Sequence, residues 1–324
     1  MFVRKKKVKG KIYFYGVLTF RLPGKKFKKF TIYLGKQKPS EKQLHEKEQK
    51  LIDRIYLQRL AGFKLKYLTK EEAIKVDLVK DSFLEKYGKL NAREKDLFIR
   101  DQTINFVYTT LRTENVLVSR KDVSTAYDLF DDASKRVVKS ENILICANMI
   151  SGLNFAKSKQ TLTKDFVKKL HEIVMYAFEE KKPGQIRREQ VYIMRALKSQ
   201  LFSEEIGYRP PKASEINKEL SKFFKWLDEN RNVYPLELAA LIHIKFYKIH
   251  PFYDGNKRTA RLLFNKILFD NGYPILNISE NTTDYFEALV DSVEKNKEKM
   301  FVKYVYDYFV NKYSKIKLGT TSKK

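Results

Sequence analysis

The spacing of apolar residues predicts a mainly helical chain. From about residue 70 to 315, apolar side chains recur every three or four positions, as at Phe166, Leu170 and Ile173, which is the period of an amphipathic helix. A first, highly charged helix is predicted over residues 40–60, because Ser40 offers an N-cap and Glu41 an acidic group in the first turn. Two stretches interrupt this pattern.

The first interruption is the N-terminus. Residues 12–20 and 27–34 are rich in β-branched and aromatic side chains, and Pro23-Gly24 lies between them, so a β-hairpin or a three-stranded sheet is predicted. Residues 1–40 hold 13 Lys or Arg and no Asp or Glu. We therefore expect nucleic-acid phosphates as a possible partner of residues 1–38. The alternative is a basic, solvated hairpin packed on the rest of the chain.

The second interruption is the window 183–212, which opens with Pro183-Gly184 and closes with Pro210-Pro211. It contains the β-like run Glu189-Gln190-Val191-Tyr192-Ile193, which is typical of a short strand.

Composition narrows the class of protein. The 324 residues carry 66 Lys and Arg against 39 Asp and Glu, a formal net charge of +27, which favours an anionic partner. The single cysteine, Cys146, lies in an apolar run, so a buried, inert thiol is expected. No apolar stretch reaches the roughly 20 residues of a membrane span. We therefore expect a cytoplasmic protein without a membrane partner; the sequence does not indicate its oligomeric state.

The chemistry concentrates at residues 250–261, His-Pro-Phe-Tyr-Asp-Gly-Asn-Lys-Arg-Thr-Ala-Arg. His250 is expected at the C-terminal end of a helix that begins near Pro235, where an imidazole can accept a proton. Asp254 is a hard oxygen ligand suited to Mg²⁺ shared with phosphates. Gly255-Asn256 allows a tight turn into a helix whose N-terminus binds anions. Arg258 and Arg261 are three residues apart and therefore share one helix face.

These twelve residues resemble the signature of Fic-domain proteins, His-Pro-Phe-x-(Asp/Glu)-Gly-Asn-Gly-Arg-x-x-Arg. The resemblance extends over about residues 95–312 and implies a mainly α fold, a Fic-type helical bundle with a small β-hairpin flap. The basic β-rich module would precede it. The expected domains are a module at 1–38, a helical linker region at 39–94, the Fic domain at 95–312 and a basic tail at 313–324.

The resemblance also implies an activity. Fic proteins mostly transfer AMP from ATP to a Ser, Thr or Tyr hydroxyl of a target protein, with Mg²⁺. His250 resembles the general base and Asp254 the metal ligand. The flap, here 186–194, would pair with the target's backbone through Val191, Tyr192 and Ile193. The phosphates would be held by Gly255, Asn256, the backbone of Lys257, Arg258 and Arg261.

A second motif resembles the family's inhibitory sequence, (Ser/Thr)-x-x-x-Glu-(Gly/Asn). It comprises Thr110, Glu114 and Asn115. Thr110 and Glu114 are four residues apart and would share a helix face. The resemblance implies that Glu114 engages Arg261 and displaces the γ-phosphate. The alternative is a solvent-exposed glutamate.

Lys257 departs from the family pattern, which usually has glycine there. A lysine at this position occurs in the related Doc toxins, so transfer of the γ-phosphate by a Doc-like protein kinase is an alternative. Removal of AMP from a modified target is another, and a nucleic-acid-associated regulator that depends on the basic N-terminus is a third.

Two further sequence features give weaker evidence for function than these motifs. Tyr285 and Phe286 lie where the family contacts adenine, without its usual polar partner. His171-Glu172 begins like a zinc-protease motif, but Met175 replaces the second histidine, and we interpret the pair as a surface coincidence.

Overall fold

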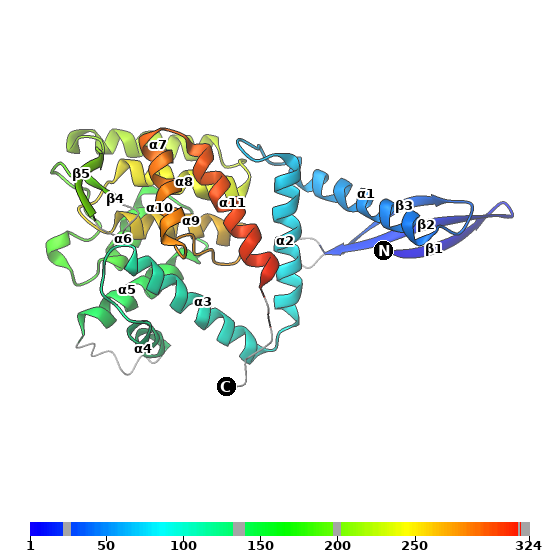
Figure 1. Cartoon of the computed structure of the whole chain (residues 1–324), viewed down its shortest axis with the longest axis horizontal. Coiled ribbons are helices and arrows are strands. Elements are labelled where there is room, and N and C mark those ends of the chain that lie inside the picture. The colour runs from blue at the N-terminus through cyan, green and yellow to red at the C-terminus, as the bar shows by residue number, and fades with distance from the viewer. Residues whose placement is uncertain (22–26, 132–139, 197–201, 317, 319–324) are drawn as a thin grey trace. The chain divides into compact units, whose positions relative to one another are not determined.

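The computed structural model describes residues 1–21, 27–131, 140–196, 202–316 and 318. The described residues are mainly helical (Figure 1), which confirms the predicted class. They divide into two compact units, Met1–Lys64 and Leu65–Lys324. The sequence had suggested boundaries at 38 and 94 instead.

The first unit is a three-stranded antiparallel sheet followed by a helix. Its strands β1 (Phe2–Val8), β2 (Lys11–Arg21) and β3 (Phe27–Gly35) are ordered β1-β2-β3. Helix α1 (Glu41–Leu60) begins with a capping box at Ser40 and packs on β2 and β3. The predicted sheet and helix are therefore confirmed. Because α1 covers part of the sheet, the compact unit extends to residue 64, beyond the expected end at 38. The predicted Pro23-Gly24 turn lies outside the described residues.

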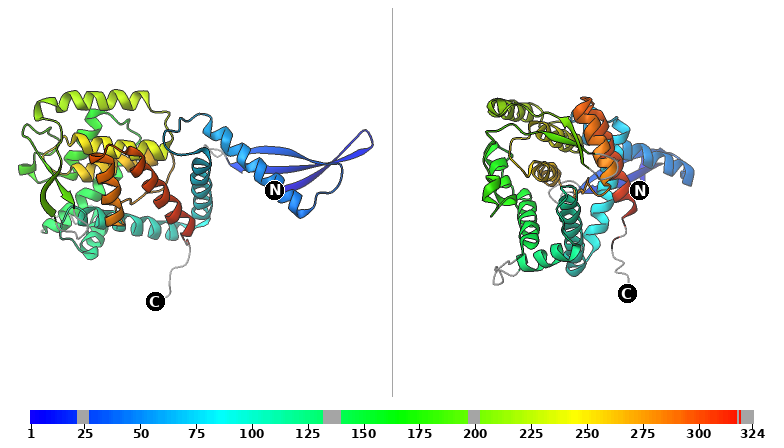
Figure 2. Two further views of the ribbon diagram at one scale, coloured as in Figure 1. Left: turned by 45° about the horizontal axis from the view of Figure 1, so that its top comes forward. Right: turned by 60° about the vertical axis from the view of Figure 1, so that its left-hand side comes forward.

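The second unit is a bundle of helices with one hairpin (Figures 1 and 2). Its first elements are α2 (Lys70–Lys89), α3 (Ala92–Arg112), α4 (Arg120–Asp131), α5 (Glu141–Ala156), α6 (Lys164–Val174) and the 3₁₀ turn η3 (Glu179–Lys181). The hairpin strands β4 (Ile193–Ala196) and β5 (Phe202–Tyr208) come next. The remaining elements are η4 (Ala213–Glu215), α7 (Ile216–Glu229), α8 (Pro235–Ile249), α9 (Asn256–Asp270), α10 (Thr282–Glu294) and α11 (Glu298–Lys315).

Helices α8 and α9 form the centre of this bundle. They pack against each other, while α5 and α6 cover α9 and α11 covers α8. Leu241, Ile242, Leu262 and Leu263 are fully buried, so the apolar patterns that predicted these two helices correspond to faces removed from water on nearly all sides. The two helices therefore give a rigid frame to the loop between them.

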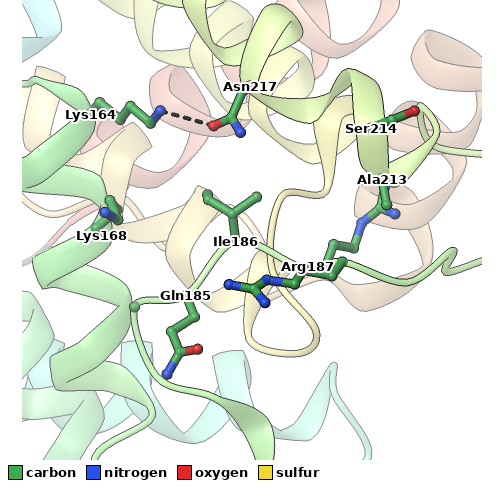
Figure 3. Close-up of a pocket in the computed structure, with 10 residues that line it drawn as sticks. Lys164, Lys168, Gln185, Ile186, Arg187, Ala213, Ser214 and Asn217 are labelled. Atoms are coloured by element: carbon green, nitrogen blue, oxygen red, sulfur yellow. Dashed lines mark hydrogen bonds between the residues drawn. The ribbon is translucent and has the colours of Figure 1, made fainter.

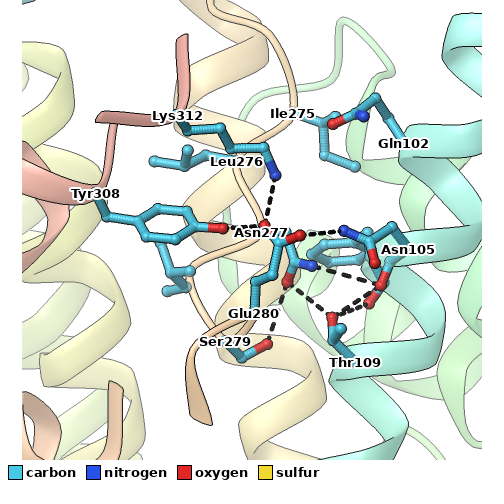
Figure 4. A network of polar contacts seen from close by, with 12 residues as sticks. Gln102, Asn105, Thr109, Ile275, Leu276, Asn277, Ser279, Glu280, Tyr308 and Lys312 are labelled. Atoms are coloured by element: carbon cyan, nitrogen blue, oxygen red, sulfur yellow. Dashed lines mark hydrogen bonds and ion pairs between the residues drawn. The ribbon is translucent and has the colours of Figure 1, made fainter. Parts of the chain in front are cut away.

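A polar network fixes α3 to the rest of the bundle (Figure 4). Asn105 Nδ2 donates to Glu280 at 2.8 Å, and Lys312 Nζ donates to the same carboxylate at 2.9 Å. Thr109 Oγ1 donates to Asn277 Oδ1 at 2.9 Å. Because both ends of each contact are satisfied, the network holds the C-terminal half of α3 in one position. The residues that follow α3 are thereby directed toward α9.

Two sequence expectations need correction. Of the β-like run 189–193, only Ile193 lies on a strand, because Gln190 Nε2 instead donates to the carbonyls of Val191 and Pro210. The expected basic tail begins inside α11, which continues to Lys315. Tyr313 is buried against Phe83, with ring centroids 4.8 Å apart. Apolar contact therefore extends the folded unit into the predicted tail.

Candidate active site

The loop between α8 and α9 is fixed by its own side chains. Helix α8 ends at His250, whose φ is +49°, and α9 begins after Gly255. The Asn256 amide closes the loop, because Phe252 N donates to its Oδ1 and its Nδ2 donates to the Phe252 carbonyl, both at 2.9 Å. Phe252 itself is fully buried. The Asn256 side chain therefore shapes the loop, and the backbone N–H groups of the first turn of α9 lie where the sequence predicts an anion site.

Gly255 is required for conformation and for space. Its φ is +71°, in the left-handed region that side chains disfavour, and an added Cβ would lie 2.7 Å from Met175 Sδ. The glycine thus lets the start of α9 approach the residues at the end of α6.

His171, on α6, packs against the loop between α8 and α9 and is not the surface residue that the sequence suggested. It is fully buried, and its ring stacks on Phe252 with centroids 3.7 Å apart. Nδ1 accepts from Gly184 N and Nε2 donates to the Asp254 carbonyl, each at 2.8 Å. Burial lowers its pKa to about 4, so the ring is neutral and both nitrogens are satisfied. Its position on the apolar face of α6, close to Val174, was the available sequence signal.

Arg187 is a second supporting residue that the sequence did not reveal. Only 1% of it is exposed, and its backbone N donates to Pro251 O at 2.9 Å. Its guanidinium donates to the carbonyls of His250 at 2.8 Å, Glu189 at 2.8 Å and Pro211 at 2.7 Å. One side chain therefore joins His250 to both ends of the hairpin segment.

The environment of His250 favours a neutral imidazole. Burial is the main cause that lowers its pKa to about 4, and Lys257 and Arg187 add to the effect. Nδ1 lies 3.2 Å from the Tyr247 carbonyl, so this nitrogen carries the proton and donates it. Nε2 is then the basic nitrogen, able to accept a proton from a hydroxyl.

Asp254 and Arg258 form an ion pair beside His250. Their Oδ1 and Nη2 atoms are 3.2 Å apart, and the Asp254 side chain is 42% exposed. One accessible carboxylate next to an anion site suits Mg²⁺, which is commonly held by one or two carboxylates together with substrate phosphates. Among the described residues no cluster of three or more His, Cys, Asp or Glu is present to hold a metal by protein ligands alone.

Glu114 lies against Arg261, as the sequence led us to expect. Glu114 lies beyond the end of α3 at Arg112, and not on one helix face with Thr110 as predicted. Its Oε1 is 2.7 Å from Arg261 Nη2. The arginine is fully buried and also contacts the Thr110 carbonyl at 3.1 Å and Tyr285 OH at 3.3 Å. Asn115, with a φ of +59°, turns the chain away after this contact.

Both members of the pair between Glu114 and Arg261 are ionised. Burial opposes ionisation of Glu114, but Lys257, Arg261 and Arg258 outweigh it and lower the pKa of the carboxyl to about 2. Lys257 Nζ lies 3.9 Å from Glu114 Oε2.

Within the described residues, the buried Nε atoms of Arg258 and Arg261 have no hydrogen-bond partner. Two buried donors beside a helix N-terminus fit a polyphosphate.

The two aromatic residues expected near adenine have different surroundings. Tyr285 is fully buried, where it accepts from Arg261 and donates to His243 Nε2 at 3.2 Å. It therefore supports Arg261, and its ring is not accessible to a base. Phe286 is half-buried, with Lys257 Nζ 5.8 Å from its ring centre. Of the pair, Phe286 is the one placed to contact a ligand.

The expected flap residues lie at the base of the hairpin rather than along it. Val191 and Tyr192 precede β4, and Ile193 is its first residue. Tyr192 is 51% exposed, and Arg209 lies 5.8 Å from its ring centre. A cavity of about 570 Å³ also borders this base, between α6, residues 184–188 and the start of α7 (Figure 3).

Two other expectations from the sequence concern the single cysteine and membrane-spanning helices. Cys146 is fully buried, which confirms the expected burial, and burial raises the pKa of its thiol to about 12. In the described part of the chain, none of the helices combines the length and apolar character needed to cross a membrane.

Comparison with known proteins agrees with this geometry. Residues 161–268 match the model of the Fic/DOC family. A protein adenylyltransferase Fic from Drosophila ananassae is 29% identical over 151 residues, which span 46% of this chain and only 28% of that relative. A Fic family protein from Desulfovibrio desulfuricans G20 has a similar fold, with a TM-score of 0.61 and 22% identity over 78% of this chain and 76% of that one.

A second solved structure gives the same result. The Fic domain containing signaling protein from Bacteroides thetaiotaomicron VPI-5482 has a TM-score of 0.59 and 18% identity, over 74% of this chain and 94% of that one. The resemblance seen in residues 250–261 is thus confirmed by the family match and by the fold. Residues 161–268, which carry His250, Asp254 and Arg261, are thus a Fic/DOC domain.

Proposed function

We propose that this protein transfers AMP from ATP to a hydroxyl side chain of a target protein, and that Glu114 inhibits the transfer. The observation that carries the proposal is the 2.7 Å ion pair between Glu114 and the fully buried Arg261. Arg261 lies on α9, the helix whose N-terminus is the expected anion site. A buried arginine paired with a removable carboxylate is suited to exchange that carboxylate for a phosphate.

His250 would act as the general base. Its neutral ring, with Nδ1 directed to the Tyr247 carbonyl, leaves Nε2 to take the proton from a Ser, Thr or Tyr hydroxyl. The hydroxyl oxygen then forms a bond to the α-phosphorus, the bond from that phosphorus to the bridging oxygen breaks, and pyrophosphate leaves. Arg258 and the amides at the start of α9 would stabilise the charge that develops on the phosphoryl oxygens.

ATP and Mg²⁺ are the cofactors that the residues fit. Asp254 would hold the metal, which when bound neutralises phosphate charge. Arg261 would hold the γ-phosphate once Glu114 has left. Lys257 contributes its backbone N–H, and its side chain adds a positive charge close to the same position.

The hairpin supports a protein as the acceptor. Strands β4 and β5 form a two-stranded antiparallel sheet, and a sheet with free edges can pair with an extended segment of a target. Val191, Tyr192 and Ile193 would lie at the base of that pairing. Arg187, which joins the hairpin base to His250, would keep the docked segment in register with the base.

The experiment uses ATP labelled separately at the α- and γ-phosphates. The wild type and Glu114→Gly are incubated with each label, and protein-bound label is measured on the enzyme itself and on candidate targets. We expect α-label only, and much more of it with Glu114→Gly. Transfer of neither label by Glu114→Gly would refute a transferase, and its abolition by His250→Ala in the same background tests the base.

Transfer of the γ-phosphate is the second candidate, and Lys257 is the observation that favours it. The Lys257 side chain is 18% exposed and directed toward Glu114, where it would recharge the anion site and could favour a reversed nucleotide. We rank AMP transfer first because Arg261 and its masking carboxylate are both present. Removal of AMP from a target is a third outcome, and loss of α-label from a pre-modified target would reveal it.

We also propose that the first unit binds nucleic acid. Strand β1 is exposed along its whole length. The register pairs Arg4 with Tyr15 and Tyr15 with Tyr33, and it pairs Lys6 with Tyr13. Directly paired residues share a face of a sheet, so two cations and three tyrosines lie on one face. Cations positioned by a sheet suit a phosphate backbone, and the rings suit bases.

Alternation along β1 supplies a matched control for this proposal. Arg4→Gln with Lys6→Gln removes two charges from the tyrosine face, and Lys5→Gln with Lys7→Gln removes two from the other. We expect the first pair to weaken binding to an oligonucleotide and to lower the salt slope by about 2. Equal effects of both pairs would mean that charge alone attracts nucleic acid, and no binding by the wild type would exclude it.

A further inference from the structure

The cavity at the base of the hairpin is separate from the residues that would bind ATP. It has a volume of about 570 Å³, within the range of small-molecule sites, and is bounded by α6, residues 184–188, η4 and the first turn of α7 (Figure 3). None of residues 250–261 lines it. It therefore requires a ligand of its own if it is a site.

The charge of the lining selects the ligand. Lys164, Lys168 and Arg188 line the cavity, with Arg187 in its wall, and none of the described residues that line it is acidic. Lys164 Nζ donates to Asn217 Oδ1 across the cavity at 3.0 Å. Within the described residues, Lys168 and Arg188 form no ion pair. Like charges gathered around one cavity repel each other, and a bound anion removes that cost.

Neighbouring carboxylates do not neutralise the cavity. On α6, Glu172 pairs with Lys169 at 3.1 Å. On α7, Glu219 pairs with Lys222 at 2.7 Å. Glu215 accepts from the backbone N of Lys212 at 3.2 Å. These three carboxylates are thus engaged elsewhere, and Asp165, which follows Lys164 on α6, does not line the cavity.

The remaining polar groups suit an oxyanion. Gln185, Ser214 and Asn217 bring amide and hydroxyl donors. Ser214 lies in η4, and Asn217 lies in the first turn of the 14-residue helix α7. The N-terminal end of a helix attracts negative charge. Three cations favour a multiply charged group over a single carboxylate, and a guanidinium such as that of Arg188 can hold two phosphate oxygens at once.

The wall of the cavity is also the support of the signature loop. Gly184 N donates to His171, which donates to the Asp254 carbonyl. Arg187 binds the carbonyls of Pro251 and His250, and Arg188 N donates to Tyr253 OH at 2.9 Å. Any ligand that orders residues 184–188 therefore acts on the loop from His250 to Asp254.

We propose that this cavity is a second anion site, which takes a phosphate group and transmits its presence to the loop at 250–256 through residues 184–188. The ligand carries a phosphate monoester or anhydride, either on a small molecule or on a phosphorylated protein segment. Its binding orders the support of His250 and Asp254 without contact with either side chain.

The test is hydrogen exchange of the full chain, with and without pyrophosphate or a phosphoserine peptide. Peptides from 164–170 and 213–220 report the cavity, and those from 250–256 report the loop. The cavity variant is Lys168→Gln with Arg188→Gln. The control is Lys225→Gln with Lys295→Gln, an equal charge change at exposed positions of α7 and at the end of α10. Thermal unfolding confirms that all three proteins are folded, and no turnover is needed, so the result is independent of the proposed transferase activity.

We expect slower exchange at the cavity and the loop in the wild type and the control, with affinity lowered about tenfold or more in the cavity variant. Protection by pyrophosphate assigns a small molecule, and protection by the peptide alone assigns a protein segment. The proposal is overturned if neither probe protects 164–170 and 213–220, or if the cavity variant binds like the control. It is also overturned if protection of 250–256 persists in the cavity variant, because pyrophosphate would then act directly at the proposed nucleotide site.

Discussion

Replacing Glu114 with glycine should make the protein less stable and its stability dependent on ATP. Arg261 is fully buried and the Glu114 side chain is 9% exposed. After the change, the guanidinium keeps only the Thr110 carbonyl and the Tyr285 hydroxyl. Breaking a buried ion pair in this way typically costs about 3–5 kcal/mol, because one charge stays buried without compensation.

This cost can be measured as a melting temperature. At about 2 °C per kcal/mol for a unit of this size, Glu114→Gly should melt about 6–10 °C below the wild type. Mg²⁺-ATP at about 100 times its dissociation constant adds about 2.7 kcal/mol, so it should recover much of the loss. The wild type should gain less, because its nucleotide must displace Glu114 from Arg261.

The assay is thermal unfolding of both proteins with and without Mg²⁺-ATP. Glu219→Gln is the control, since its pair with Lys222 is largely exposed and should change stability by no more than about 1 kcal/mol. Equal melting temperatures for wild type and Glu114→Gly, together with equal gains from ATP, would refute the view that the carboxylate and the γ-phosphate compete for one buried arginine.

Three further results are expected. In the Glu114→Gly background His250→Ala should abolish transfer without changing the melting temperature appreciably; transfer at an unchanged rate would remove His250 as the base. The pKa of His250 is near 4 and that of Glu114 near 2, so mild acid should neither protonate the base nor release the inhibition. The lowered pKa values of His171 and His250 mean that the unfolded chain binds more protons between their usual value of 6.5 and about 4, so stability should fall as pH decreases through that window; a titration with flat stability there would contradict both buried rings. Arg187→Lys keeps the positive charge but cannot donate to all three carbonyls that the guanidinium binds, so KM for a protein target should rise while ATP binding is retained. The control, Arg188→Lys, should change neither KM nor ATP binding. Loss of ATP binding by Arg187→Lys would indicate a general defect of the fold.

The helical fold was predictable because its signals are local. The Ser40 capping box, the first-turn Pro235 and the 3.6-residue apolar period each act within a few residues. The two element boundaries that differed from the prediction depend on contacts between residues distant in sequence. Residues 189–192 are not strand because Gln190 reaches the Pro210 carbonyl, and the tail is helical because Tyr313 packs on Phe83.

The residues of the candidate site likewise fall into those that the local sequence brings together and those that distant contacts bring together. The sequence by itself determined the groups available on one short segment, His250, Asp254, Arg258 and Arg261, since a loop and one helix turn bring them together whatever surrounds them. Tertiary structure alone decided how they are held. His171 and Arg187 lie 79 and 63 positions before His250, and nothing in their local patterns shows that they bind the loop's carbonyls. Burial keeps the His250 imidazole neutral, while Lys257, Arg261 and Arg258 keep Glu114 ionised against the effect of its burial. Both charge states depend on tertiary structure, because packing removes water from the site and brings a glutamate distant in sequence to these cations.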